Sequence, residues 1–317
     1  MRLMACDACP RRCAVDRAAG EVGFCGCPHL PRVAHVCLHR WEEPCISGSR
    51  GSGTVFFGGC NLKCVFCQNY RISVRPVGRT HDPDALANVF LAQEQRGAHN
   101  VNLVSPTPYA APVAEALRLA RARGLTVPVV YNSNAYETVE SLRRLEGLVD
   151  VYLPDLKYRE ESLARRYSAA PGYFGAATAA LKEMVRQTGE AAFDGDGLMT
   201  RGVLVRHLAL PGCSADSAAL LRWLARELPG VHLSLMAQYT PVHRAREFPE
   251  LTRTLRPEEY EPLLDLCDEL GLDRGYRQGV DSPGEEYIPP FAPDTPFAAD
   301  TGKGGGGLEE GPEDSPR

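Results

Sequence analysis

The distribution of cysteine most constrains what this chain can fold into. Ten of the twelve cysteines fall within the first 67 of 317 residues, where proline, glycine and arginine are also frequent. Residues 1–50 show no sustained apolar repeat of 3.6 or 2 residues, so a hydrophobic core does not explain how they become ordered. Clustered thiols without an export signal are typical of metal binding rather than of disulfides. We therefore expect bound metal to order this region.

A separate group of three cysteines follows an apolar run and the pair Gly58-Gly59 in GSGTVFFGGCNLKCVFCQNY. Cys60, Cys64 and Cys67 have the spacing C-x3-C-x2-C. A four-iron cluster with three protein thiolates keeps one iron open for a small chelating molecule. A structural zinc site usually has four Cys or His ligands in two close pairs, and this loop offers no fourth. The spacing therefore favours a [4Fe-4S] cluster over zinc.

From residue 53 onward, short β-rich runs alternate with helical segments, which predicts an α/β fold with parallel strands. The expected strands are 54–58, 100–104, 127–131, 149–153, 202–209 and 232–236. The expected helices are 83–96 with Asp82 as its cap, 110–123, 135–145, helices across 160–188, 214–227, and 257–270 with Pro257 in its first turn. Six such units form either an open doubly wound sheet or an incomplete barrel. The cysteine loop at the end of the first strand favours the barrel.

The cysteine motif also resembles that of a known family. With Phe66 before the third cysteine, it is similar to the C-x3-C-x-aromatic-C signature of radical S-adenosylmethionine (SAM) enzymes. The longer stretch LHRWEEPCISGSRGSGTVFFGGCNLKCVFCQNYRIS resembles pyruvate formate-lyase activating enzyme-like (PflX-type) proteins with an N-terminal cysteine cluster. The resemblance extends from about Cys6 to Tyr287. It implies a partial (β/α)6 TIM-type barrel with the cluster loop after the first strand.

The resemblance implies an enzyme in which Cys60, Cys64 and Cys67 hold a [4Fe-4S] cluster that reductively cleaves SAM. The resulting 5′-deoxyadenosyl radical would abstract hydrogen from a substrate, with a glycyl radical enzyme as the first candidate. An electron donor such as flavodoxin or ferredoxin is the implied partner. Two alternatives stay open: radical modification of another peptide, an RNA or a small molecule, and a non-catalytic iron-sulfur or zinc binding module.

Short motifs after the later strands resemble the turns with which such activators contact SAM. The residues implied are Asn132, Ser133 and Asn134 in YNSNAY, Asp155 and Lys157 in LPDLKY, Arg206 and His207 in VRHLALPG, and Gln238 and Tyr239 in SLMAQY. Lys157 is implied to meet the SAM carboxylate and Asp155 a cationic group. Adjacent strand residues point oppositely, so only one of Arg206 and His207 faces inward.

Each of these residues also has a purely structural interpretation. Asp155 could cap a helix, Arg206 could form an internal ion pair, and His207 could be a buried core histidine. Where the activators carry a Gly-Gly-Glu-type turn, this chain reads VSPTPY. The substitutes at that turn are Ser105, Pro106 and Thr107.

The N-terminal cysteines have a spacing of their own. Cys6, Cys9, Cys13 and Cys25 form C-x2-C-x3-C-x11-C, and Cys27 is an extra candidate. This spacing can close a four-thiolate site around zinc or an iron-sulfur cluster. A cluster could relay electrons or bind a peptide, whereas zinc would anchor the segment. The other cysteines are expected to be bystanders: Cys37, Cys45, Cys213 and Cys267.

These features divide the chain into a Cys-rich extension (1–50), a barrel (51–284) and a Gly- and Pro-rich tail (285–317) expected to be largely disordered. The net charge of −5 gives no general attraction to phosphate backbones, so nucleic acid is not an expected partner. No apolar stretch approaches the roughly 20 residues of a membrane span, and the N-terminus has no signal-peptide core. We expect a cytoplasmic protein.

Overall fold

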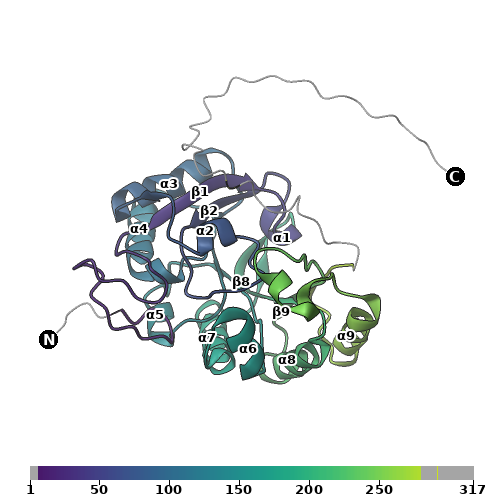
Figure 1. Cartoon of the computed structure of the whole chain (residues 1–317). Coiled ribbons are helices and arrows are strands. Elements are labelled where there is room, and N and C mark those ends of the chain that lie inside the picture. Colours follow the sequence, from purple (N-terminus) through teal and green to yellow (C-terminus); the bar gives the residue numbers. More distant parts are fainter. Residues whose placement is uncertain (1–5, 280–290, 292–317) are drawn as a thin grey trace, which may run out of the picture.

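The fold is a curved sheet with helices on its outer side, seen in a computed structural model that describes residues 6–279 and Phe291 (Figure 1). Six parallel strands form its centre and occur in the sheet in chain order. They are β2 (Ser52–Phe57), β4 (Val101–Val104), β5 (Val129–Ser133), β6 (Val151–Pro154), β8 (Met199–Leu208) and β9 (His232–Met236). A doubly wound sheet would reverse direction at a switch point, and this order does not. The predicted partial barrel is therefore confirmed.

Short strands extend or flank this sheet in the described part of the chain. These are β1 (Arg32–His39), β3 (Arg79–Thr80), β7 (Ala192–Phe193) and β10 (Gly275–Arg277). β1 pairs antiparallel with β2 and with β3, β7 pairs antiparallel with β8, and β10 pairs parallel with β9. The sheet thus ends in β10 on one side and in β1 and β3 on the other.

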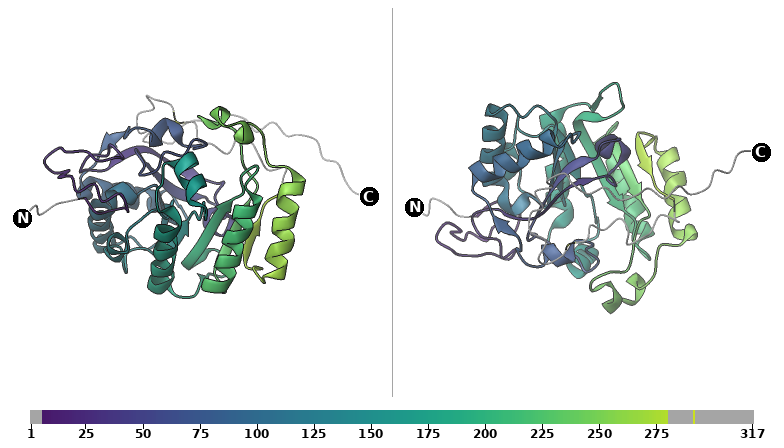
Figure 2. Two further views of the ribbon diagram at one scale, coloured as in Figure 1. Left: turned by 60° about the horizontal axis from the view of Figure 1, so that its bottom comes forward. Right: turned by 90° about the horizontal axis from the view of Figure 1, so that it is seen from above.

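The longer helices cover the convex side of the sheet, as both views in Figure 2 show. They are α3 (Pro83–Gln95), α4 (Ala110–Ala122), α6 (Glu161–Ser168), α7 (Tyr173–Thr188), α8 (Ser214–Glu227) and α9 (Pro257–Glu269). Asp82 caps α3 by accepting a hydrogen bond from the Ala85 amide at 2.8 Å, and Pro257 occupies the first turn of α9. Both sequence predictions of helix starts are confirmed. Shorter helices are α1 (Pro44–Ser47), α2 (Tyr70–Ser73) and α5 (Val139–Arg143), with 3₁₀ turns at Thr107–Tyr109, Ala245–Glu247 and Pro249–Leu251.

Strand alternation separates the main core from the interior of the barrel. On β2, Val55 and Phe57 pack outward into the core with Phe90 of α3, whereas Phe56 lines an interior cavity. At the amino ends of the strands, Cys45 and Ile46 of α1 complete a smaller apolar cluster inside the barrel. The helix α1 therefore closes this end of the barrel, and the interior stays open toward the carboxyl ends.

The strand β1 is absent from the sequence prediction, which found no periodicity within residues 1–50. Its register with β2 shifts between Val33 and His35, and this irregularity breaks the two-residue alternation that marks a strand. From there on the pairing is regular, ending at His39 opposite Ser52. Part of the Cys-rich segment thus belongs to the sheet, while the division into segments 1–50 and 51–284 stays a prediction.

The third unit also differs from the prediction. The strand β5 begins at Val129, after Pro128, and the helix expected over 135–145 is reduced to α5. Thr138 caps α5 by accepting from the Ser141 amide at 3.2 Å, so residues 134–138 form a loop. This leaves the YNSNAY motif at a strand end rather than in a helix.

Two other expectations bear on the described residues. The tail predicted over 285–317 lies outside them except for Phe291, whose ring packs against Phe56 with centroids 5.3 Å apart. Among the described helices, none combines the length and apolarity that a membrane crossing needs.

The glycine pair before Cys60 gives a first prediction. A Cβ on Gly58 would lie 2.1 Å from the backbone oxygen of Val77, so Gly58→Ala must displace backbone. We expect a loss of about 1–3 kcal/mol in the free energy of unfolding, measured by urea denaturation. Gly175→Ala in α7, where a Cβ meets nothing within 4 Å, is the control and should gain about 0.5–1 kcal/mol. Equal midpoints for the two variants would contradict the close approach at Gly58.

Candidate active site

Cys60, Cys64 and Cys67 lie in the loop after β2 and line one cavity of about 520 Å³. Each sulfur has a polar neighbour within hydrogen-bonding distance. The distances are 3.4 Å from Asn134 Nδ2 to Cys60 Sγ, 3.0 Å from Ser168 Oγ to Cys64 Sγ, and 3.3 Å from Ser73 Oγ to Cys67 Sγ. The three thiols therefore belong to one polar-lined site.

The loop is fixed from behind by backbone and aromatic contacts. The amides of Lys63 and Val65 donate to carbonyls at the end of α6, at 3.0 and 2.8 Å. The ring of Phe66 packs edge-on against Tyr239 with centroids 5.9 Å apart. Tyr239 in turn donates its hydroxyl proton to the Leu251 carbonyl at 2.8 Å. Tyr239 thus supports the cysteine loop and does not line the cavity.

Burial shapes the acidity of these thiols. It raises the pKa of Cys60 to about 12 and that of Cys67 to about 11, and it also raises the pKa of Cys64. A metal ligand must be a thiolate, and a cationic metal centre offsets the cost of burying that negative charge. The three partly buried thiols therefore suit ligation of a positively charged metal centre better than existence as free thiolates.

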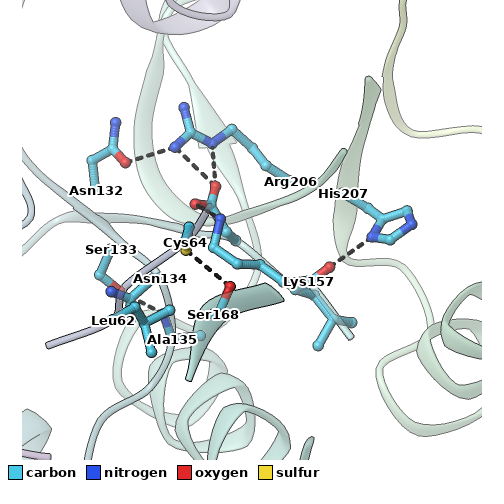
Figure 3. A network of polar contacts seen from close by, with 12 residues as sticks. Leu62, Cys64, Asn132, Ser133, Asn134, Ala135, Lys157, Ser168, Arg206 and His207 are labelled. Atoms are coloured by element: carbon cyan, nitrogen blue, oxygen red, sulfur yellow. Dashed lines mark hydrogen bonds and ion pairs between the residues drawn. The ribbon is translucent and has the colours of Figure 1, made fainter. Parts of the chain in front are cut away.

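A chain of partly buried charged side chains forms the wall beside Cys64 (Figure 3). Lys157 Nζ lies 2.7 Å from Asp155 Oδ2, and Arg206 Nε donates to Asp155 Oδ1 at 3.0 Å. Arg206 also donates from Nη2 to the Asn132 side-chain oxygen at 2.7 Å. Asp155 and Arg206 come together because the ends of β6 and β8 are bridged at these two residues.

The opposing charges keep both partners ionised. Burial alone would raise the pKa of Asp155, but Lys157 and Arg206 outweigh it and lower that pKa. Burial alone would lower the pKa of Lys157, but Asp155 outweighs it and raises that pKa. The Lys157 ammonium thus stays charged at the cavity wall, with donors left over for a bound anion.

Sequence reasoning missed Glu42, which enters the barrel interior from the segment after β1. Its Oε2 accepts from Arg206 Nη1 at 3.1 Å, and its Oε1 lies 3.2 Å from Asn132 Nδ2 and 3.3 Å from Asn102 Nδ2. Burial raises the pKa of Glu42. The only sequence signal is the acidic pair in WEEP, which does not reveal that Glu42 reaches Arg206, Asn132 and Asn102 in the barrel interior.

The neighbouring Glu43 also lines the cavity. Its Oε2 is buried and has no hydrogen-bond partner among the described residues. Burial raises the pKa of Glu43 as well. A buried acceptor without a partner is costly and often marks a place where a ligand binds.

Most of the predicted contact residues meet at this cavity. The cavity-lining set comprises Asn132, Ser133, Asn134, Asp155, Lys157, Arg206 and Gln238. From the divergent VSPTPY turn, Ser105 lines the cavity, whereas Pro106 and Thr107 do not. The strand-end motifs thus converge on the cysteine loop.

His207 is the exception, and its prediction as a cofactor contact is wrong. Its Nδ1 lies 2.7 Å from the Leu156 carbonyl and its Nε2 lies 2.8 Å from Ser217 Oγ, so both ring nitrogens are occupied. Figure 3 shows His207 turned away from Arg206. Alternation along β8 directs one side chain inward and the next toward α8. The core-histidine interpretation is the correct one.

Comparison with known proteins identifies the family. Residues 54–193, which include the cysteine loop, match the model of the Radical SAM superfamily. The chain is 31% identical over 283 residues to the uncharacterized protein MJ0674 of Methanocaldococcus jannaschii, a match that covers 86% of this chain and 76% of that protein. The chain belongs to the radical SAM superfamily. It is therefore an enzyme that uses a [4Fe-4S] cluster and SAM, and the three partly buried thiols and the cavity beside them, with both polar and apolar lining residues, fit this pair.

Solved structures give remoter likenesses. A domain of pyruvate-formate lyase-activating enzyme from Bacteroides vulgatus matches with a TM-score of 0.37 and 16% identity, covering 53% of this chain and 89% of that chain. HydG, a maturase of the [FeFe]-hydrogenase, matches with a TM-score of 0.49 and 14% identity, covering 74% of this chain and 53% of that chain. SuiB of Streptococcus suis bound to SAM matches with a TM-score of 0.47 and 14% identity, covering 69% of this chain and 48% of that chain. At this distance the likenesses carry no information on substrate.

The histidine on the outer face of β8 gives a second prediction. Burial lowers the pKa of His207 to about 4 from its ordinary value of 6.5. As the pH falls from 6.5 toward 4, the unfolded chain binds the proton first, so the free energy of unfolding decreases, by up to about 3 kcal/mol. Urea denaturation at pH 7.5 and pH 5 should show a smaller pH dependence in His207→Gln than in the wild type. An unchanged pH dependence would show that His207 is not held neutral.

Proposed function

We propose that Cys60, Cys64 and Cys67 bind the [4Fe-4S] cluster and that SAM occupies the adjoining cavity. The observation that supports this most is the convergence of three partly buried thiols and several strand-end polar side chains on one cavity of about 520 Å³. Three thiolates leave one iron free for the amino and carboxylate groups of SAM. A cluster held by Cys60, Cys64 and Cys67 would supply, once reduced by an external donor, the one electron that reductive cleavage of SAM requires. That cleavage would give methionine and a 5′-deoxyadenosyl radical able to take a hydrogen atom from the substrate.

The chain's own residues hold and orient these groups. Lys157, beside Cys64, binds the SAM carboxylate through its ammonium protons. Asp155 fixes the position of Lys157 and is itself fixed by Arg206. Asn134 donates to the Cys60 sulfur at 3.4 Å, which stabilises the thiolate form. The Phe66 ring, which packs against Tyr239, helps to hold the loop in place.

The first candidate substrate is a glycine residue in a partner protein, from which the enzyme would make a glycyl radical. Support for it comes from the resemblance of the cysteine loop and of LPDLKY to glycyl-radical-enzyme activators. A small electron-transfer protein of the flavodoxin or ferredoxin type is the proposed reductant. Its electron would enter at the cluster loop, which lies at the open end of the barrel.

Glu43 favours a second candidate, a substrate that carries a positively charged or N–H donor group. The buried Oε2 of Glu43 has no hydrogen-bond partner among the described residues, although the Arg206 guanidinium and the Ser234 side chain lie near the carboxyl group. A bound amino or guanidinium group would satisfy it and offset the cost of burial. Such a group could belong to a peptide side chain or to a small molecule.

The cluster assignment gives a third prediction. Anaerobic protein reconstituted with iron and sulfide, reduced with dithionite and given SAM should release 5′-deoxyadenosine. Cys64→Ala should lower the rate at least about 100-fold, because it removes a cluster ligand. Cys213→Ala, at a cysteine that does not line the cavity, should keep the wild-type rate. Equal product from Cys64→Ala would contradict the ligand assignment.

Glu43→Gln separates the two substrate candidates. If Glu43 binds a donor group of the substrate, the variant should release 5′-deoxyadenosine at the wild-type rate without substrate and show about a tenfold higher KM for the true substrate. A weaker affinity for SAM alone, measured by equilibrium binding, would instead mean that Glu43 contacts SAM. A glycyl radical signal with an unchanged KM would favour the first candidate.

A further inference from the structure

The four spaced cysteines of the N-terminal segment converge on one small cavity. Cys6, Cys9, Cys13 and Cys25 line an enclosed space of about 20 Å³. Arg11 and Arg17 also line it, as does Asn61 of the SAM-cluster loop. Four thiols that share one enclosed space with two guanidinium groups are the composition of a thiolate metal site.

The structure separates Cys25 from its neighbour Cys27, which the sequence could not do. The Cys27 sulfur lies 3.6 Å from the Cys25 carbonyl and 3.8 Å from the Gly58 carbonyl, and it is buried in the main core. It does not line the thiol cavity. A Cβ on Gly59 would approach it to 2.4 Å, so Cys27 packs under the glycine pair. Cys27 thus has a packing role, and Cys25 is the fourth candidate ligand.

The loop that carries the cysteines is built tightly around them. The Cys6 amide donates to the Val15 carbonyl at 3.1 Å and the Ala14 amide donates back to the Cys6 carbonyl at 3.3 Å. Arg12 and Ala14 take left-handed conformations, with φ of 40° and 52°, on either side of the third cysteine. Such conformations are costly without glycine and persist where the surroundings require them.

Positively charged side chains lie beside the cavity, where they would stabilise thiolates. Arg17 Nη1 lies 3.9 Å from the Cys6 sulfur, and Arg17 is held in place by the Cys27 and Pro28 carbonyls at 3.1 and 2.7 Å. The Cys27 amide donates to the Cys25 sulfur at 3.4 Å. A divalent ion with four thiolates carries a net charge of about −2. The two guanidinium groups offset that charge.

The cavity is also joined to the SAM-cluster loop through Asn61, the residue after Cys60. Arg11 Nε donates to the Asn61 carbonyl at 2.8 Å, and Asn61 lines the thiol cavity together with Cys9. The Asn61 side chain accepts from Asn134 Nδ2 at 2.8 Å, and that nitrogen also lies 3.4 Å from the Cys60 sulfur. Asn61 thus lies between the two groups of thiols.

We propose that Cys6, Cys9, Cys13 and Cys25 bind a second metal centre and that it holds the SAM-cluster loop in position through Asn61. The small volume favours a single ion of the zinc type over a four-iron cluster. In the described part of the chain no three Cys, His, Asp or Glu side chains are already placed at metal-binding distances from one point, so the proposal requires the four sulfurs to move closer together when the ion binds. The effect on the cluster loop rests on the proposed function, and the metal site does not.

The test measures zinc, iron and sulfide in full-length protein purified anaerobically. The triple variant Cys60→Ala, Cys64→Ala, Cys67→Ala should keep about one zinc per chain. Adding Cys9→Ser and Cys13→Ser should remove it, while adding Cys27→Ala as the matched control should not. Far-UV circular dichroism shows whether each variant is folded. If a variant is unfolded as purified, it is refolded and its zinc content is then measured by titration.

The outcomes test three points separately: whether the four cysteines bind a metal, which metal it is, and whether it affects the SAM-cluster loop. Iron and sulfide in the triple variant that disappear with Cys9 and Cys13 would support the ligand set and overturn the zinc assignment. Absence of any stoichiometric metal in the folded triple variant, also after zinc titration, would overturn the site. The proposed effect of the second metal on the SAM-cluster loop has its own test. The double variant Cys9→Ser, Cys13→Ser in the otherwise wild-type chain should change the electron paramagnetic resonance spectrum of the reduced cluster with SAM. An identical spectrum would overturn the proposed effect on the loop. Retained zinc together with no SAM cleavage by the wild type would refute the proposed function alone.

Discussion

The ion pair between Asp155 and Arg206 is the interaction on which the rest of the site depends. A guanidinium buried inside a barrel is strongly destabilising unless carboxylates and hydrogen-bond acceptors surround it. Arg206 finds Asp155 on the adjacent strand, Asn132 two strands away and Glu42 from the N-terminal segment. These contacts connect β5, β6, β8 and the segment after β1 across the interior. They also leave Lys157 charged and pointed at the cysteine loop.

This arrangement explains why the cavity opens toward one end of the barrel only. At the amino ends of the strands, Cys45 and Ile46 fill the interior with apolar contacts. The polar residues of the cavity lie closer to the carboxyl ends of the strands. Parallel strands bring their carboxyl ends to the same edge, so residues such as Ser133 and Asp155 come close although they are far apart in sequence. The cysteine loop after β2 lies at that same edge. Radical chemistry needs this geometry, because it must be shielded on all sides but one.

The sequence predicted the local features well and the non-local ones poorly. The six parallel strands and the cap at Asp82 follow from patterns that are visible in one stretch of sequence, and the position of Lys157 at the cavity follows from the resemblance of LPDLKY to the activators. Glu42 could not be found this way, because its role depends on partners about 60, 90 and 164 residues away. The outward direction of His207 depends on strand parity, which adjacent residues do not reveal. β1 escaped because a register shift interrupts its alternation.

The N-terminal segment contributes to the site from two directions, which argues against treating it as an appendage. From inside the barrel, Glu42 holds Arg206 and thereby the charged wall. From outside, Arg11 binds the backbone of Asn61, one residue from Cys60. Both contacts restrain the same cavity, and neither is supplied by the six parallel strands. The N-terminal segment has little hydrophobic core of its own, so its contacts with the active site help to order it. A thiolate-bound metal would stabilise the part of the segment that has the least apolar packing.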